Sequence, residues 1–402
     1  IGAVADDLTG ATTTGVLLAR SKARTAVFFN EEAAQEARET ASLDAILISS
    51  NSRPLPKEEA YDKVKSATNA LKAMGVKYFS KRIDTTLRGG VGVEIDAMLD
   101  QLNEDTIAVV VPAMPQSRRI LVGGYSVIDG VALINTPVAQ DVRTPVKENY
   151  IPRLLAGQTR RKVTLDQVLK GKEGIKEALT EVRNDGAGVI IVDAITLEDV
   201  DQIAQACIDL DWDVVAVDPG PFTSKLAYRR GLIQEEQPNV PPAASEEGKT
   251  VLIAAGSATP VTKKQMQVLC EDSRHVRISV EPIPLINGGD EALDEAFKAV
   301  NKAVELIESD KQPRAILFET ALHGELLNLD EEDKKRGYAG GMSANRINAG
   351  LGTIISQVLE QVGREKIAGL YTTGGDTMVN VCYQLGVECI EVMDYVIPQT
   401  DV

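Results

Sequence analysis

Residues 1–11 read IGAVADDLTGA and predict the architecture of the chain. Residues 2–5 are continuously apolar, as in a strand that is buried on both faces of a parallel sheet. Asp6 and Asp7 follow, and a helix is predicted to begin near Thr9. Ligands of open α/β sheets lie beyond the carboxyl ends of the strands, where these aspartates fall. If the strand geometry continues through them, the two side chains point in roughly opposite directions and only one faces a ligand. Alternatively, one of them caps the helix.

Short apolar runs alternate with helical stretches along the whole sequence. Stretches such as 58–74 and 290–307 are long enough for the crossover connections between parallel strands. The predicted strands are 2–5, 45–49, 78–80, 107–111, 188–192, 214–217, 251–255, 277–279, 315–318, 369–372 and 389–392. This alternation predicts an α/β fold of largely parallel sheets flanked by helices.

A chain of 402 residues is too long for one ordinary compact core, so we expect two domains. Residues 235–248 read EEQPNVPPAASEEG, and their prolines, small residues and acids leave little to bury. We therefore expect an N-terminal domain over 1–235, a linker over 236–248 and a C-terminal domain over 249–402. The active site is expected in the cleft between the two domains.

Composition excludes several classes of function. The formal charge of −16 disfavours nucleic acid and anionic membranes as partners. No apolar run approaches the ~20 residues of a membrane span, and no signal peptide is recognisable. Four cysteines without CxxC spacing and only two histidines supply neither a disulfide framework nor a histidine-based metal site. A cytoplasmic protein is expected.

The segment KRIDTTLRGG (81–90) gathers the groups that an anionic polyol needs. Arg88 can bind a carboxylate through two hydrogen bonds, while Asp84, Thr85 and Thr86 can bind hydroxyl groups. The alternative is a solvated turn with surface ion pairs. Because a surface turn has no need of so dense a cluster, we favour a binding site.

Further basic residues follow other strands. Arg53 lies in NSRP (51–54), and PAMPQSRR (112–119) ends in Arg118 and Arg119. Basic residues that recur at strand ends of an acidic protein indicate one focused anion site. Each arginine taken singly is also compatible with a solvated surface position.

Two segments of the second half each join a strand to a helix. They are AAGSATP (254–260) and YTTGGDT (371–377). Their glycines would let a phosphate approach free backbone N–H groups, and Thr373 and Thr377 supply hydroxyls. Structural tight turns are the alternative. GKT (248–250) lacks the first glycine of a P-loop, and GLGTII (350–355) lacks the third glycine of a dinucleotide fingerprint, so both are set aside.

From these residues alone, the chain is a two-domain α/β protein that binds a small anion and a nucleotide. Seven motifs also occur in the order in which they occur in the four-carbon acid sugar kinase family, which the chain resembles. They are ADDLTGA, NSR, KRIDTTLRG, PAMPQSRR, VDPGPF, GSATPVTKKQ and TTGGDT. The resemblance spans almost the whole chain. It implies ATP-dependent phosphorylation of a hydroxyl on a 3-oxo-tetronate, threonate or similar acid.

The resemblance also implies roles for single residues. Asp7 or Asp84 would act as the base or orienting group, with Asp7 slightly favoured. Mg²⁺ would bridge the ATP phosphates, although no metal ligand is identified. The implied substrate residues are Asp6, Asp7, Arg53, Asp84, Thr85, Thr86, Arg88 and Arg119. The implied nucleotide residues are Gly256, Ser257, Gln265, Gly374, Gly375, Asp376 and Thr377. A homodimer is also implied.

The chain departs from the family pattern at Thr85, Gly90 and Arg118, where Ser, Asn and Gly are usual. It also ends at Val402, before a glycine-rich segment of the family, so the nucleotide domain is expected to be incomplete at its C-terminal end. Two other functions remain open: a sugar-acid sensor without catalysis, and a nucleotide-dependent hydroxy-acid oxidoreductase, which the missing dinucleotide fingerprint disfavours.

Overall fold

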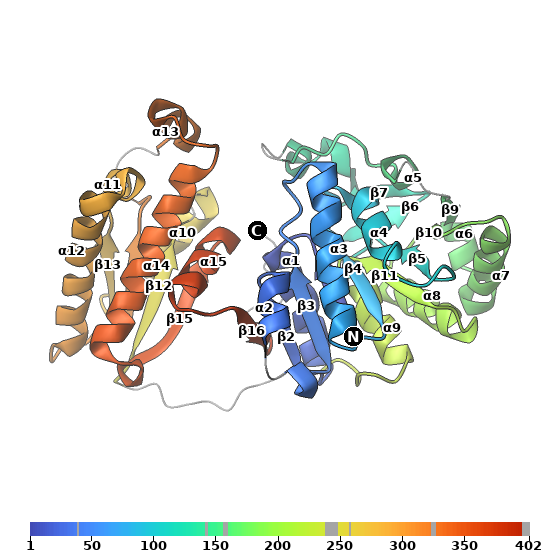
Figure 1. Cartoon of the computed structure of the whole chain (residues 1–402), viewed down its shortest axis with the longest axis horizontal. Helices are drawn as coiled ribbons and strands as arrows, with labels where there is room; N and C mark the ends of the chain where they lie inside the picture. The colour runs from blue at the N-terminus through green and yellow to red at the C-terminus, as the bar shows by residue number, and fades with distance from the viewer. Residues whose placement is uncertain are drawn as a thin grey trace. The chain divides into compact units, whose positions relative to one another are not determined.

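The computed structural model of the chain describes residues 1–37, 40–140, 144–155, 160–237, 248–256, 259–322 and 327–395. These residues form two compact units (Figure 1). The first unit contains the described residues up to 237 together with 389–395, and the second contains 248–388. Among the described residues, no helix has both the length and the apolar character that crossing a membrane requires.

The first unit is built on a nine-stranded sheet in the order β16-β2-β3-β1-β4-β11-β5-β10-β9. Every pairing in it is parallel except that of β16 with β2. Its strands are β1 (Gly2–Ala5), β2 (Thr25–Phe28), β3 (Ala45–Ser49), β4 (Phe79–Arg82), β5 (Ile107–Val110), β9 (Arg160–Val163), β10 (Val189–Val192), β11 (Val214–Asp218) and β16 (Cys389–Val392).

Helices cover both faces of this sheet, which is why its central strands are apolar at consecutive positions. Val110 packs in one core with side chains of α3 and α4, whereas Val109 packs in another with side chains of α7, α8 and α9. The helices are α1 (Leu8–Arg20), α2 (Glu31–Glu36), α3 (Lys57–Ala73), α4 (Val91–Leu99), α5 (Ile151–Leu154), α6 (Leu165–Val168), α7 (Gly171–Asn184), α8 (Leu197–Asp209) and α9 (Pro221–Arg229). A small antiparallel sheet contains β6 (Arg119–Val122), β7 (Tyr125–Ile128) and β8 (Val131–Ala132).

The second unit has a four-stranded parallel sheet in the order β13-β14-β12-β15. Its strands are β12 (Thr250–Ala255), β13 (His275–Ser279), β14 (Ala315–Glu319) and β15 (Ile367–Thr373). Its helices are α10 (Pro260–Leu269), α11 (Pro282–Asn287), α12 (Gly289–Glu308), α13 (Leu329–Arg336), α14 (Met342–Val362) and α15 (Gly375–Gln384). Apolar residues of α12 and α14 pack with β12 and β14 in one core.

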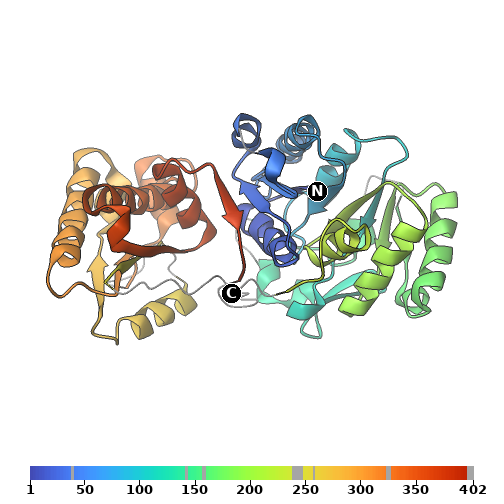
Figure 2. The same cartoon turned by 90° about the horizontal axis from the view of Figure 1, so that it is seen from below.

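The structure confirms the predicted α/β fold with largely parallel sheets, and it differs from the sequence analysis at one domain limit. The strand β16, expected in the C-terminal domain, pairs antiparallel with β2 of the first unit (Figure 2). Sequence patterning detects this strand but cannot choose its partner, because hydrogen bonds between strands join residues that are distant in the chain. The expected linker lies mostly outside the described residues.

The GLGTII segment lies within α14, in agreement with the rejection of a dinucleotide motif. A Cβ atom at Gly352 would lie 2.9 Å from the backbone oxygen of Asn380 in α15. The glycine at this position therefore lets α14 and α15 pack closely, which is a structural role.

Candidate active site

The carboxyl ends of three neighbouring strands meet at one edge of the large sheet. Ala5 of β1 pairs in register with Ser49 of β3 on one side and with Arg82 of β4 on the other. The segments that follow these strands carry the predicted acid-binding residues. The topology thus brings ADDLTGA, NSR and KRIDTTLRGG together, although up to about eighty residues separate them in the chain.

Six charged residues form a connected group at this edge, which we call the acid-site cluster: Asp6, Asp7, Arg53, Arg82, Asp84 and Arg88. Arg53 is at its centre. Its Nε lies 2.7 Å from Asp6 Oδ2, and its Nη1 lies 2.7 Å from Asp7 Oδ2. Its Nη2 lies 3.6 Å from Asp84 Oδ1. One guanidinium therefore contacts the carboxylates of both predicted motifs.

Arg82 is a member of the cluster that sequence analysis did not single out. Its Nη1 lies 3.2 Å from Asp6 Oδ1 and 3.2 Å from Asp7 Oδ1. A Cβ atom at Gly10 would lie 1.9 Å from this nitrogen, so Gly10 is the residue that leaves room for the guanidinium. The available signal was a charged residue at the last position of an otherwise buried strand, since a buried charge needs partners.

Asp84 organises the loop that follows β4. Arg88 donates to it through Nε at 2.7 Å and through Nη2 at 3.1 Å, and the Thr86 hydroxyl also donates to its Oδ2. The loop turns back through left-handed backbone conformations at Leu87 (φ 61°) and Gly89 (φ 88°). In the described structure Arg88 binds the carboxylate of Asp84, so its binding of a substrate carboxylate stays a prediction.

The strand geometry on which the opposite directions of Asp6 and Asp7 depended does not continue through them. Both carboxylates contact Arg53 and Arg82, because β1 ends at Ala5 and the backbone bends at the two aspartates. Asp7 also caps α1, since its Oδ1 accepts a hydrogen bond of 2.7 Å from the backbone N–H of Gly10. The capping role and the place in the cluster thus belong to the same residue.

Burial divides the cluster into an inner and an outer set. The side chains of Asp6, Arg82 and Asp84 are at most 5% exposed, whereas those of Asp7 and Arg88 are 27% and 25% exposed. Burial raises the pKa of Asp7, and the negative charge of Asp6 raises it further. Burial alone would also raise the pKa of Asp84, but the Arg88 hydrogen bonds and the charge of Arg53 hold that pKa below its ordinary value.

Arg118 and Arg119 belong to the hairpin of β6 and β7. Arg118 adopts a left-handed backbone conformation, and its exposed side chain pairs with Asp129 at 2.8 Å. Nη1 of Arg119 donates to the backbone oxygen of Ser117 at 3.2 Å. The part of Arg119 in substrate binding stays a prediction, as does that of the half-buried Thr85.

In the second unit, the carboxyl ends of two neighbouring strands also meet at one edge of the sheet. Ala255 of β12 pairs in register with Thr373 of β15, so Gly256 and Gly374 follow adjacent strand ends. A Cβ atom at Gly256 would lie 2.5 Å from Thr377 Oγ1 and 2.3 Å from Asn348 Oδ1. The backbone at Gly256 is therefore in close contact with the first turn of α15.

Helix starts provide the donors at this edge. Gly374 has a φ of 91° and precedes α15, whose first turn contains Gly375, Asp376 and Thr377. The Thr377 hydroxyl donates to Asn348 Oδ1 at 2.9 Å. Asn348, on α14, was missed because nothing around it in the sequence resembles a binding motif.

The hydroxyl oxygen of Thr373 is buried and has no hydrogen-bond partner within the described part of the chain. Gln265 lies exposed on α10, and Ser257 lies outside the described residues. Gly256, the start of α15 and this hydroxyl together suit the close approach of a phosphate group.

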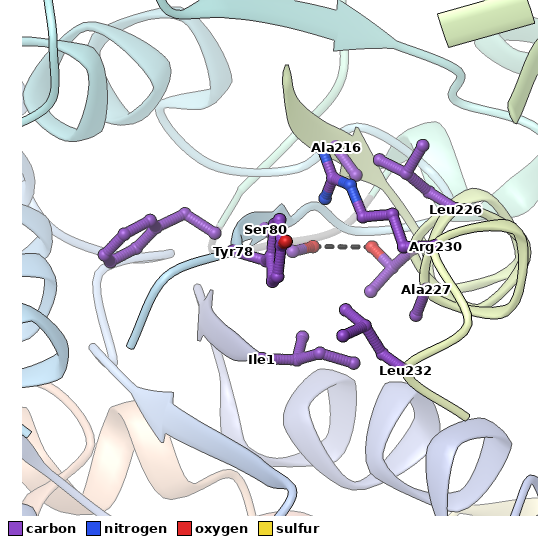
Figure 3. Close-up of a pocket in the computed structure, with 10 residues that line it drawn as sticks. Ile1, Tyr78, Ser80, Ala216, Leu226, Ala227, Arg230 and Leu232 are labelled. Carbon is purple, nitrogen blue, oxygen red and sulfur yellow. Dashed lines mark hydrogen bonds between the residues drawn. The ribbon is translucent and has the colours of Figure 1, made fainter. Parts of the chain in front are cut away.

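Within the described ranges, no group of three or more His, Cys, Asp or Glu side chains is placed to hold a metal ion. A separate cavity of about 10 Å³ lies between β4, β11 and α9 of the first unit (Figure 3). Ser80, Arg230 and Leu226 are among its lining residues. It has room for about one water molecule, so it is too small for a sugar acid.

Comparison with known proteins agrees with this division into two sites. A family described as the sugar-binding N-terminal domain matches residues 1–226, and one described as the nucleotide-binding C-terminal domain matches residues 252–402. The chain is 37% identical to a D-erythronate kinase of Heliobacterium modesticaldum over 98% of its own length and 88% of the relative. It is 28% identical to a D-threonate kinase of Salmonella typhimurium, with the same shares covered.

Solved structures share the fold. A Haemophilus influenzae protein superposes with a TM-score of 0.73 at 22% identity, over 97% of this chain and 90% of that one. A Bordetella bronchiseptica protein, determined as a domain-swapped dimer with bound citrate, has a TM-score of 0.52 at 25% identity, over 96% and 86% of the two chains. Because both domain families and these kinases match nearly the whole chain, the chain belongs to the four-carbon acid sugar kinase family.

Proposed function

We propose that the chain transfers the γ-phosphoryl group of ATP to a hydroxyl group of a four-carbon sugar acid, in the class of erythronate, threonate or 3-oxo-tetronate. The observation that carries the proposal is the acid-site cluster, which concentrates three guanidinium groups at the carboxyl ends of β1, β3 and β4. The named activities of the similar kinases support the same substrate class.

Arg88 and Arg53 are the proposed carboxylate ligands. Arg88 is a quarter exposed, and Arg53 spreads its three nitrogens among three aspartates. The described cluster holds three carboxylates and three guanidiniums and is formally neutral. A substrate carboxylate would therefore compete with Asp7 for Arg53 and with Asp84 for Arg88, while the threonine hydroxyls and Arg119 would bind the sugar hydroxyls.

Asp7 is the better proposed base, and Asp84 the better organiser. Asp7 is partly exposed and its raised pKa brings it closer to the range in which a base accepts a proton well. Asp84 is buried, its pKa is lowered, and Arg88 and Thr86 already hydrogen bond to its oxygens. Asp7 would then orient the acceptor hydroxyl and take its proton.

The second unit is the proposed ATP site. Gly256, Gly374 and Gly375 would let the phosphates approach the backbone, and Thr377, Asp376, Ser257 and Gln265 complete the proposed contacts. Mg²⁺ would be bound chiefly by the phosphate oxygens, where it neutralises charge that develops during transfer. Transfer requires the acceptor oxygen to come within about 3–3.5 Å of the γ-phosphorus.

The function is tested with a panel of four-carbon sugar acids. We expect ATP-dependent ADP release with at least one acid, and phosphorus NMR should identify a phosphate ester on a sugar hydroxyl. The uncharged polyol of the same carbon number is the matched control, and it should react at least about tenfold more slowly because it lacks the carboxylate. Acid binding without ADP release would instead favour the sensor, and nicotinamide-dependent oxidation would favour the oxidoreductase.

Asp7→Asn separates the proposed base from its structural role. Asparagine keeps an oxygen that can cap α1, so the melting temperature should change little. We expect kcat to fall about a hundredfold or more, with the affinity for the ATP analogue unchanged.

In the wild type, kcat/KM should fall as the pH drops through the raised pKa of Asp7, because the base must be deprotonated, and the Asp7→Asn variant should lack this dependence. Wild-type kcat in the variant would rule out Asp7 as the base.

Gly256→Ala tests the proposed nucleotide site. The added methyl group must displace Thr377 or Asn348, so we expect affinity for a non-hydrolysable ATP analogue to fall by about tenfold or more in calorimetry. Gly369→Ala on β15 is the control, because its methyl group would meet no atom within 4 Å. Equal affinity in both variants would show that the close approach at Gly256 serves the fold alone.

A homodimer is also part of the proposal. The domain-swapped dimer of the Bordetella bronchiseptica protein supports it. Light scattering coupled to size-exclusion chromatography should give about twice the 43.2 kDa mass of this chain, and a monomeric mass at micromolar concentration would contradict it.

A further inference from the structure

Beneath the acid-site cluster lies a second group of polar side chains that the proposed chemistry does not use. Lys81 Nζ pairs with Glu94 Oε2 at 2.7 Å, and Ser52 donates to Glu94 Oε1 at 3.0 Å. The hydroxyls of Ser52 and Ser50 are 2.9 Å apart. We call these four residues the buried polar chain. All four are at most 2% exposed, so none of them is open to a substrate.

The buried polar chain joins the strands that hold the cluster. Lys81 donates to the backbone oxygen of Arg82 at 2.9 Å, at the end of β4. At its other end, Ser50 donates to the backbone oxygen of Ala5 at 2.9 Å, at the end of β1. Glu94 lies in the first turn of α4, the helix that begins directly after the loop of Arg88. One chain of hydrogen bonds therefore links β1, β3, β4 and α4.

Three of the residues that these hydrogen bonds join directly precede a cluster residue in the sequence. Ala5 precedes Asp6, Ser52 precedes Arg53, and Lys81 precedes Arg82. Because one planar peptide bond joins each of these pairs, a hydrogen bond that holds the first residue also restricts the position of the second. The buried polar chain is thus placed to set the positions of three charged groups at once.

Stability alone does not explain a buried ion pair. Removing two charges from water costs several kcal/mol per ion, and an apolar pair of similar volume is often as stable or more stable. Here the ion pair of Lys81 and Glu94 is connected by hydrogen bonds to the ends of β1, β3 and β4 and to α4, the elements next to the acid-site cluster. We propose that Lys81 and Glu94 are positioning residues, which hold the acid-site cluster in register for binding and phosphorylation of the sugar acid. This inference rests on the proposed function.

The central experiment replaces both charges together. Lys81→Met with Glu94→Leu keeps similar volumes and leaves no unpaired buried charge, so the melting temperature should stay near that of the wild type. We expect KM for the acid to rise and kcat to fall, with a combined loss in kcat/KM of about tenfold to a hundredfold. Affinity for the ATP analogue, measured by calorimetry, should not change.

The matched control is the ion pair of Arg229 and Asp201, which joins α9 to α8 at 2.9 Å and contacts no cluster residue through its described hydrogen bonds. Arg229→Met with Asp201→Leu should leave kcat/KM for the acid unchanged, whatever happens to the melting temperature. A loss of acid kcat/KM equal to that of the Lys81/Glu94 variant would mean that any removed ion pair has this effect, and would overturn the proposal.

Ser52→Ala is the second variant, and it decides the question if the double variant does not fold. It removes only the hydroxyl between Glu94 and β3, so we expect a severalfold loss in acid kcat/KM at near-native stability. Wild-type acid kcat/KM in a folded double variant, or in Ser52→Ala, would overturn the proposal. If the wild type binds acids without phosphorylating them, the proposed function fails alone, and acid affinity replaces kcat/KM in the same comparison.

Discussion

Burying charge at the end of a parallel sheet is the constraint on which the first unit depends. Asp6, Arg82 and Asp84 are nearly inaccessible, and an unpaired charge there would cost several kcal/mol. Each is therefore tied to a partner of opposite charge, and Arg53 links all three aspartates. The same pairing that makes the burial tolerable also holds the outer Asp7 and Arg88 at the edge where a ligand can reach them.

Close backbone approach has the same purpose in both units. Gly10 leaves room for the Arg82 guanidinium, and Gly256 leaves room for Thr377 and Asn348. In each case a residue with a Cβ atom would push away the polar group that the site needs. A specific neighbouring side chain therefore accounts for the glycine in each motif. The candidate site of the first unit consists of charged side chains, whereas that of the second consists of backbone N–H groups and hydroxyls.

The path of the chain between the units was only partly predictable. A polar, proline-rich segment indicated one passage, from the first unit to the second. The return of the chain was not predicted, since β16 reads as an ordinary short strand and its pairing with β2 depends on residues more than 350 positions away. The chain therefore passes between the units twice, once near the predicted linker and once before β16.

The sequence by itself determined the fold class, most of the strands, and the motifs of both sites, because apolar periodicity and turn chemistry are local properties. Which residues contact one another at the two candidate sites could be learned only from the tertiary structure. Lys81 and Arg82 open the KRIDTTLRGG motif but were not singled out within it, and Asn348 and Glu94 lie in segments that look ordinary. Contacts between distant strands and helices bring all four residues to the candidate sites. Likewise, the sequence favours Asp7 only slightly over Asp84 as the base. Only burial and the neighbouring charges distinguish them, by raising the pKa of one and lowering the pKa of the other.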